Sequence, residues 1–143
     1  SNTAIRRGID NTPTDLHIIN LKYLAEKVFQ PLREHFGVPI YISSGYRSKA
    51  LNEAIGGSKT SFHSHGMALD LDQDGKNRGV SNADVFYYIK NNLPFSELIW
   101  EFGDKDNPNW VHVAIAKGRE NEKKTVIAFK ENSRTKYKKW DRD

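Results

Sequence analysis

Apolar residues in the first quarter of the chain recur at the spacing of one helix face. They stand three or four positions apart, at Leu21, Leu24, Val28 and Leu32, and such a stripe typically faces a protein core. Thr12 and Pro13 are typical of a helix start, because threonine can cap the first turn and proline suits the first helical position. Pro31 lacks an amide hydrogen, so we expect it to bend or divide this helix.

Farther along, the pattern changes to short apolar segments separated by turns. Alternation of apolar and polar residues, which predicts half-buried strands, is clearest at 67–72. Strands are expected at 39–43, 67–72, 97–102, 110–115 and 125–129, and helices at 48–55 and 81–93. The pattern predicts an α+β fold, an antiparallel sheet of about four to six strands flanked by helices. Strands 97–102 and 110–115 are joined by a loop and should pair antiparallel, which could bring Glu101 toward His112.

The segment around the second strand carries the candidate chemistry. His63 and His65 lie in the loop before it, and Asp70 lies on its less apolar face. A loop imidazole and a strand carboxylate are ligands that suit zinc. His112, on the polar side of its own strand, can complete the three protein ligands that a catalytic zinc commonly has. Spacing alone leaves simpler explanations open: His112 as a structural histidine, Asp70 as a turn cap and His65 as a solvated side chain.

Longer motifs around these residues resemble a known family. They are Ser43-Ser44-Gly45-Tyr46-Arg47-Ser48, then Ser61-x-His63-x-x-Gly66-x-Ala68-x-Asp70, and finally Trp110-Val111-His112-Val113. The set, spanning residues 3–116, resembles the zinc D-alanyl-D-alanine carboxypeptidase family, with the Hedgehog/DD-peptidase fold. Its phage and prophage cell-wall peptidase branch is the most similar. The resemblance implies a peptidase that cuts peptide bonds of bacterial peptidoglycan, with one Zn²⁺ per chain on His63, Asp70 and His112.

The resemblance also implies roles for residues beside the metal. The family's matching arginine lines the active site, so Arg47 is a candidate for binding a substrate carboxylate or the developing oxyanion. A surface arginine paired with an acid is the alternative. Tyr46 and Ser61 are further candidates for substrate binding, although Ser61 can equally orient His63 or serve as a turn hydroxyl. Phe62 stands where the family usually has glutamine, a departure that leaves the ligands intact.

The catalytic base is a second departure from the family pattern. Some of the resembled enzymes carry a glutamate three residues before the last histidine ligand, where this chain has Asn109. An amide cannot take a proton from water, so another acid is required. Glu101 is the best replacement, because the phage-type branch carries a similar Leu-Ile-x-Glu segment. A structural Glu101 that bonds a histidine ligand is the alternative, and Asp104 and Asp106 are weaker candidates.

Composition and charge bound the domain organisation. The chain has 143 residues and no cysteine, which predicts one domain without disulfides or thiolate ligands. Residues 1–116 hold 12 basic and 13 acidic residues, whereas residues 117–143 hold 10 and 5. We expect residues 1–116 to form the zinc peptidase domain with its N-terminal leader. Residues 117–143 should be a basic extension of that domain, one more strand followed by a loose tail.

The family resemblance and the basic C-terminal residues indicate which partners to expect. Peptidoglycan stem peptides are the expected substrate, and the basic extension could bind an anionic wall polymer. Nucleic acid is not expected, although Tyr137 and Trp140 stand among lysines. Neither a membrane-spanning run nor a signal peptide is recognised, and a monomer is expected. The protein would act on the wall after secretion, in the periplasm, or as a phage-type protein released at lysis.

A rival hypothesis comes from another functional class. The Hedgehog domains show that this fold can keep zinc without known peptidase turnover, and Asn109 leaves that possibility open here. The chain would then be a non-catalytic zinc module that binds wall peptides or a protein partner. Which peptidoglycan bond would be cut is not decided by the sequence.

Overall fold

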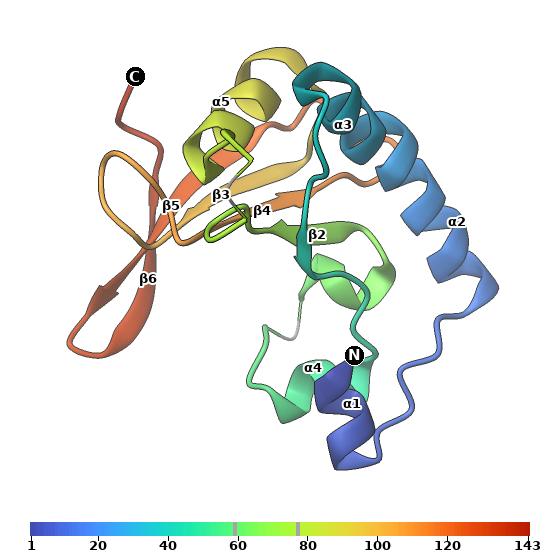
Figure 1. The fold of residues 1–143 in the computed structure, drawn as a ribbon. Coiled ribbons are helices and arrows are strands. Elements are labelled where there is room, and N and C mark those ends of the chain that lie inside the picture. Colours follow the sequence, from blue (N-terminus) through green and yellow to red (C-terminus); the bar gives the residue numbers. More distant parts are fainter. Residues whose placement is uncertain (59, 77) are drawn as a thin grey trace.

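A computed structural model of the chain describes residues 1–58, 60–76 and 78–143. Its centre is a six-stranded sheet in the order β1-β2-β4-β3-β5-β6 (Figure 1). The strands are β1 (Ile42–Ser44), β2 (Ala68–Leu71), β3 (Glu97–Glu101), β4 (Trp110–Ala114), β5 (Lys124–Glu131) and β6 (Arg134–Lys139). The helices are α1 (Asn2–Arg7), α2 (Asp15–Leu24), the π-helix η1 (Ala25–Phe29), α3 (Gln30–Phe36), α4 (Lys49–Ala54), the 3₁₀-helix η2 (Phe62–His65) and α5 (Asn82–Asn92). The predicted α+β class is confirmed. In the described residues, no helix has the length and apolarity needed to cross a membrane.

The long N-terminal helix begins two residues later than the sequence predicts. Thr14 is the cap: its hydroxyl accepts a hydrogen bond from His17 N, and His17 Nδ1 accepts one from Thr14 N, both at 3.2 Å. The expected start at Thr12 is wrong because His17 completes a capping box in place of the usual glutamate or glutamine. The division expected at Pro31 is present. The wide turn η1 precedes it, and Gln30 N donates to the carbonyl oxygen of Ala25, five residues back.

The sheet is antiparallel except for one pair of strands. β4 pairs antiparallel with both β2 and β3, which confirms the pairing expected for the two strands joined by a loop. β5 runs parallel to β3, and here the expectation of an antiparallel sheet is wrong. The segment 115–123 brings the chain back to the start of β3, where Phe95 N donates to Glu120 O at 3.0 Å and Lys123 N to Phe95 O at 3.2 Å. β5 therefore leaves in the same direction as β3.

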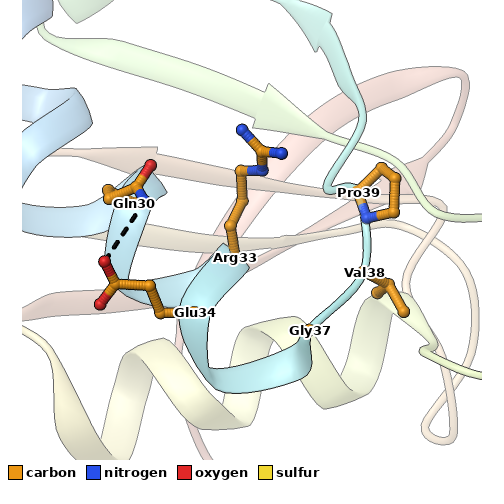
Figure 2. A pocket seen from close by; sticks show the side chains of 6 residues that line it. All are labelled: Gln30, Arg33, Glu34, Gly37, Val38 and Pro39. Carbon is orange, nitrogen blue, oxygen red and sulfur yellow. Dashed lines mark hydrogen bonds between the residues drawn. The ribbon is translucent and has the colours of Figure 1, made fainter.

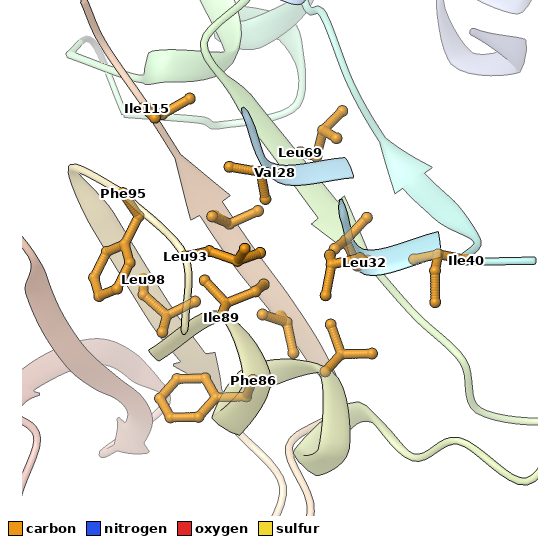
Figure 3. Close-up of a cluster of buried hydrophobic side chains, with 14 of the residues drawn as sticks. Val28, Leu32, Ile40, Leu69, Phe86, Ile89, Leu93, Phe95, Leu98 and Ile115 are labelled. Atoms are coloured by element: carbon orange, nitrogen blue, oxygen red, sulfur yellow. The ribbon is translucent and has the colours of Figure 1, made fainter. Parts of the chain in front are cut away.

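One face of the sheet is covered by helices and holds the main core (Figure 3). Its buried strand residues alternate along each strand and are Leu69, Leu71, Leu98, Trp100, Val111, Val113 and Ile127. Val28 and Leu32 of the divided helix and Phe86 and Ile89 of α5 belong to the same cluster. Burial of each such side chain contributes roughly 1.5–3 kcal/mol, so this face fixes the register of the strands. The alternate residues of β2, β3 and β4 lie on the opposite face, which carries the polar side chains.

The C-terminal extension is more ordered than the sequence predicts. After β5 the chain turns at Asn132 and Ser133, which have φ of 52° and 63°, and returns as β6 beside β5. Trp140 then lies 4.7 Å from the ring centroid of Phe86 and 5.4 Å from that of Trp100. The expected loose tail is wrong, because backbone pairing holds β6 and aromatic contacts hold Trp140.

A pocket of 340 Å³ lies at the C-terminal end of α3 (Figure 2). It is lined by Gln30, Arg33, Glu34, Gly37, Val38 and Pro39. Gln30 Nε2 donates to Glu34 Oε1 at 3.3 Å. None of the predicted metal-binding or catalytic residues belongs to this segment, so the pocket is separate from the candidate chemistry.

Candidate metal centre

The three predicted zinc ligands converge on the face of the sheet opposite the main core. Asp70 of β2 and His112 of β4 are direct partners in the antiparallel register, so their side chains lie next to each other on one face. His63 reaches the same point from η2, in the loop before β2. One ligand atom from each residue lies within 4.8 Å of the other two. The simpler explanations of Asp70 as a turn cap and His112 as an isolated histidine do not describe this arrangement.

His63 is held in place by the turn that carries it. Ser61 caps η2, its hydroxyl accepting a hydrogen bond from His63 N at 3.2 Å. The imidazole Nδ1 lies 2.8 Å from the carbonyl oxygen of Gly45, which leaves Nε2 to face Asp70 Oδ1 at 3.1 Å. At Gly66, the next turn residue, φ is +72° and a Cβ would come within 2.5 Å of His17 O. Only glycine fits this close approach to α2.

His112 lies between two carboxylates. Its Nδ1 is 3.2 Å from Asp70 Oδ1, and its Nε2 is 3.0 Å from Glu97 Oε1. The second contact does not have the angle of a hydrogen bond, and within the described residues the buried Nε2 has no hydrogen-bond partner. Lys124 Nζ lies 3.8 Å from the other oxygen of Glu97. Glu97 therefore orients the ring of a candidate ligand, as carboxylates commonly do for metal-bound histidines.

Glu97 is the functional residue that the sequence analysis missed. It lies on β3 two positions before Ile99, which is the direct partner of His112. Alternation along β3 puts Glu97, Ile99 and Glu101 on the metal-facing side. The alternation was visible in the sequence, but the register that brings Glu97 rather than Glu101 to His112 was not. The histidine-bonding role considered for Glu101 thus belongs to Glu97.

The charges in the cluster are strongly coupled. Burial by itself would raise the pKa of Asp70, but the contacting imidazoles of His112 and His63 hold it well below its ordinary value. Burial would likewise lower the pKa of His112, but Asp70 and Glu97 raise it to about 9. The metal-free centre therefore holds a proton on His112 at neutral pH. A metal ion that takes this place releases the proton.

The donor set fits a zinc ion. Two imidazole nitrogens, His63 Nε2 and His112 Nδ1, and one carboxylate oxygen of Asp70 point to a common position. This combination of nitrogen and oxygen ligands is typical of catalytic zinc, which keeps one further position open. The second nitrogen of each ring faces an oxygen, of Gly45 or of Glu97, so both rings present the nitrogen that a metal needs.

Glu101 lies on the same face as the cluster, at the end of β3. Its side chain is buried, and that burial raises its pKa to about 7. The negative charges of Asp70 and Glu97 contribute to this rise, whereas His112 and Arg47 oppose it. The direct partner of Glu101 is Trp110, which lies two positions before His112 on β4, so the register places Glu101 on the same face as His112. A carboxylate with a pKa near neutrality is suited to exchange protons.

Arg47 approaches the cluster from the turn after β1. Its backbone N donates to His63 O at 3.1 Å, which ties the turn to the loop of the first ligand. Asn11 of the leader holds the same turn, accepting from Ser48 N at 2.7 Å and donating to Tyr46 O at 3.4 Å. Among the described residues, Arg47 Nε is buried without a hydrogen-bond partner. An unpaired buried donor is costly, which points to a ligand group that accepts from it.

Tyr46 and Ser61 are placed differently from each other. Tyr46 stacks on His17 with ring centroids 4.8 Å apart, and with Arg47 it lines a cavity of 390 Å³ between the leader, β1 and α4. Substrate binding by Tyr46 stays a prediction. The hydroxyl of Ser61 is used by the cap of η2. The alternative of a turn hydroxyl that orients His63 describes Ser61 better than direct substrate binding.

We expect Glu97→Gln to weaken zinc binding by about 10- to 100-fold, the usual effect of removing a group that orients a metal ligand. Loss of the negative charge leaves His112 Nε2 without its ionic partner. The dissociation constant for zinc, measured by competition with a chromogenic chelator, checks this. Glu131→Gln removes a strand carboxylate whose Oε1 lies 2.8 Å from Lys136 Nζ, and it should leave zinc affinity unchanged. Equal affinity in the two variants would show that Glu97 has no such role.

Comparison with known proteins agrees with this geometry. A family model described as Peptidase M15 matches residues 1–114, most of the chain. A search of curated proteins finds no match. The matched region contains the three clustered ligands, Arg47 and Glu101, and the M15 peptidases are zinc-dependent. The chain therefore belongs to the M15 peptidases, the family of the zinc D-Ala-D-Ala carboxypeptidases, and is a metallopeptidase.

Proposed function

We propose that this protein is a zinc peptidase that hydrolyses peptide bonds in the stem peptides of bacterial peptidoglycan. The observation that carries the proposal is the convergence of His63, Asp70 and His112 on the sheet face opposite the main core. Beside them lie an ionisable Glu101 and Arg47, whose Nε has no hydrogen-bond partner among the described residues. Membership of the M15 family supports the reaction type. The substrate class rests on the resemblance of the motifs to cell-wall peptidases.

The reaction needs a Lewis acid, a base and a group that receives the developing negative charge. When bound, zinc polarises the scissile carbonyl and activates water for attack. Glu101 accepts the proton, and its burial holds its pKa near neutrality. Glu101 can then return the proton to the leaving amine. Asn109 is exposed directly before β4, and its amide takes no part in proton transfer.

Arg47 supplies the anion-binding group. Its pKa is lowered by burial, an effect that Asp70 and Glu101 oppose, but a guanidinium stays charged throughout the physiological range. In the part of the chain that the structure describes, Nε has no hydrogen-bond partner, so it can donate to a substrate carboxylate or to the oxyanion of the tetrahedral intermediate. A terminal carboxylate would make the enzyme a D-Ala-D-Ala carboxypeptidase. An internal bond would make it an endopeptidase of the endolysin type.

The proposal is tested by incubating purified peptidoglycan with the protein in its zinc-loaded and chelated forms. We expect loss of turbidity and release of peptides with zinc, none after chelation, and recovery when zinc is restored. Mass spectrometry of the released fragments identifies the bond. Absence of cleavage in several wall chemotypes, by protein that carries one zinc per chain, would contradict the proposal and favour a non-catalytic zinc module that binds wall peptides.

A further inference from the structure

The metal-facing side of the sheet continues beyond the M15 match, which ends at residue 114, onto the β5–β6 hairpin. One row of directly paired residues runs from His112 to Ile99, then to Val126 and Lys139. Because directly paired residues point to the same side of a sheet, Lys139 lies on the face of the metal ligand. In Figure 1 the hairpin also extends away from α3 and α5, toward the side of the sheet that these helices leave open.

The neighbouring row places an aromatic residue beside the candidate base. Trp110, Glu101, Ala128 and Tyr137 are paired in this order across β4, β3, β5 and β6. The side chain of Tyr137 is 59% exposed, although it lies on this face. Partial burial raises the pKa of Tyr137, and so do the negative charges of Glu101, Glu97 and Asp70. The hydroxyl of Tyr137 is therefore within electrostatic reach of the centre, whereas its ring remains available for contact.

Between the centre and β6 lies a small apolar cluster. Ile99, Val126 and Ala128 are its buried members, and Phe102 packs against them. Lys139 is exposed and makes no ion pair within the described parts of the chain. Lys138, its neighbour on the other face of β6, pairs with Asp141 at 3.3 Å. The metal-facing side of β6 thus combines an exposed aromatic ring with an uncompensated positive charge, next to a small buried apolar cluster.

Resting on the proposed function, we propose that the metal-facing side of β6 binds the peptide substrate three to four residues from the scissile bond. Tyr137 packs against the peptide, and Lys139 binds a carboxylate on it. Adjacent strands are about 4.8 Å apart, so β4 and β6 are separated by roughly 14 Å. An extended peptide spans that distance with about four residues, at about 3.3–3.6 Å each. Arg47 lies at the opposite edge of the sheet, beyond β2, and holds the other end of the substrate.

The distribution of charge on the metal-facing side of the sheet suits a peptide that carries a carboxylate. Asp70, Glu97 and Glu101 make the middle of the face acidic, and a metal ion compensates that charge. Lys139 lies outside this acidic zone, at the edge strand. An acidic peptide that spans the face would place its scissile bond at the metal and its carboxylate at Lys139. The basic character of residues 117–143 is then part of substrate recognition on one face of β6.

The test is a binding measurement that does not depend on turnover. Two peptides are compared that share the scissile bond and differ only in a free carboxylate or a carboxamide three or four residues away. Both are titrated by calorimetry into zinc-loaded Glu101→Gln protein, which leaves them intact. We expect about fivefold tighter binding of the carboxylate peptide at low salt, the upper range for one ion pair at an exposed site. Added salt should reduce the preference.

Variants of β6 locate the effect. In the same background, Lys139→Gln should abolish the preference, whereas Lys138→Gln, which removes an equal charge from the opposite face, should retain it. Tyr137→Ala should weaken both peptides by a similar factor of about five, and Tyr137→Phe should restore binding. Equal effects of Lys138→Gln and Lys139→Gln would overturn the proposal in favour of a general attraction of the basic extension for polyanions. A preference that Lys139→Gln leaves intact would also overturn it.

The experiments distinguish failure of the binding site on β6 from failure of the peptidase assignment. Hydrolysis of both peptides by the unmodified enzyme at equal kcat/KM, together with equal binding, would leave the peptidase assignment standing and remove the role of Lys139. Selective binding without hydrolysis by the unmodified, zinc-loaded protein would keep the site on β6 and reject the peptidase assignment.

Discussion

Glu101→Gln is expected to reduce peptide hydrolysis by about 10²- to 10⁴-fold, the usual contribution of a positioned acid or base, while zinc stays bound. Glutamine keeps the size of the side chain but cannot accept the proton. Hydrolysis rates and zinc content of the same preparation check the prediction. Glu131→Gln, on the exposed part of β5, is the matched control and should leave both unchanged. Hydrolysis within tenfold of the original rate would transfer the role of base to another acid.

The same substitution should stabilise the metal-free protein above neutral pH. Because burial raises the pKa of Glu101 from 4.5 to about 7, the folded state binds the proton more tightly than the unfolded state. The associated stability is fully present below pH 4.5 and is lost as the pH rises through 7. Glu101→Gln removes this loss, so at pH 8 the free energy of unfolding should rise by up to about 3 kcal/mol. Urea denaturation of chelated protein at pH 4 and pH 8 measures the difference, which should be small at pH 4.

Asp70→Asn is expected to have the largest effect on the metal centre. Asp70 is a ligand and also contacts both other ligands, at 3.1 Å from His63 and 3.2 Å from His112. Zinc affinity should fall by more than about 100-fold, beyond the usual loss for groups that only orient a ligand. Competition with a chelator measures it, and Asp106→Asn, in an exposed loop, is the control. Zinc affinity within tenfold of the original would exclude Asp70 as a ligand.

Asp70→Asn also changes how the stability of the metal-free protein depends on pH. The pKa of Asp70 is lowered, so its contribution is present above its ordinary range near 3.8 and is lost in acid. The pKa of His112 is raised from 6.5 to about 9, so its contribution is present below 6.5 and is lost as the pH rises through 9. Between these two pH limits, breaking the buried Asp70–His112 pair should lower the free energy of unfolding by about 3 kcal/mol. Denaturation at pH 6 measures it, and an unchanged free energy of unfolding would show that the contacts contribute nothing.

The sequence predicted the elements that carry a clear hydrophobic period. The alternation at 67–72 located β2 and the face of Asp70, and the stripe at Leu24, Val28 and Leu32 located the helix that covers the core. Pro31 predicted the division of that helix, because proline cannot donate the helical hydrogen bond at its own position. The specific motif around His63 and Asp70 carried the family assignment. These features are encoded by residues close together in the chain.

Features that depend on distant partners were not predictable. β6 has polar residues on both faces, so no period distinguishes it from a loose tail, and its pairing with β5 is what orders it. The parallel pairing of β5 follows from the path of residues 115–123 rather than from the composition of β5. Glu97 contacts His112 only because β3 and β4 pair in one particular register. A shift by two residues would have made Glu101 the direct partner of His112.

The most direct test of the metal centre is X-ray diffraction from zinc-loaded crystals at energies above and below the zinc absorption edge. We predict one anomalous peak per chain, about 2.0–2.2 Å from His63 Nε2, Asp70 Oδ1 and His112 Nδ1, with Glu101 and Arg47 facing its open side. A peak held by other residues, or none at this position in crystals of protein that carries one zinc per chain, would contradict the account.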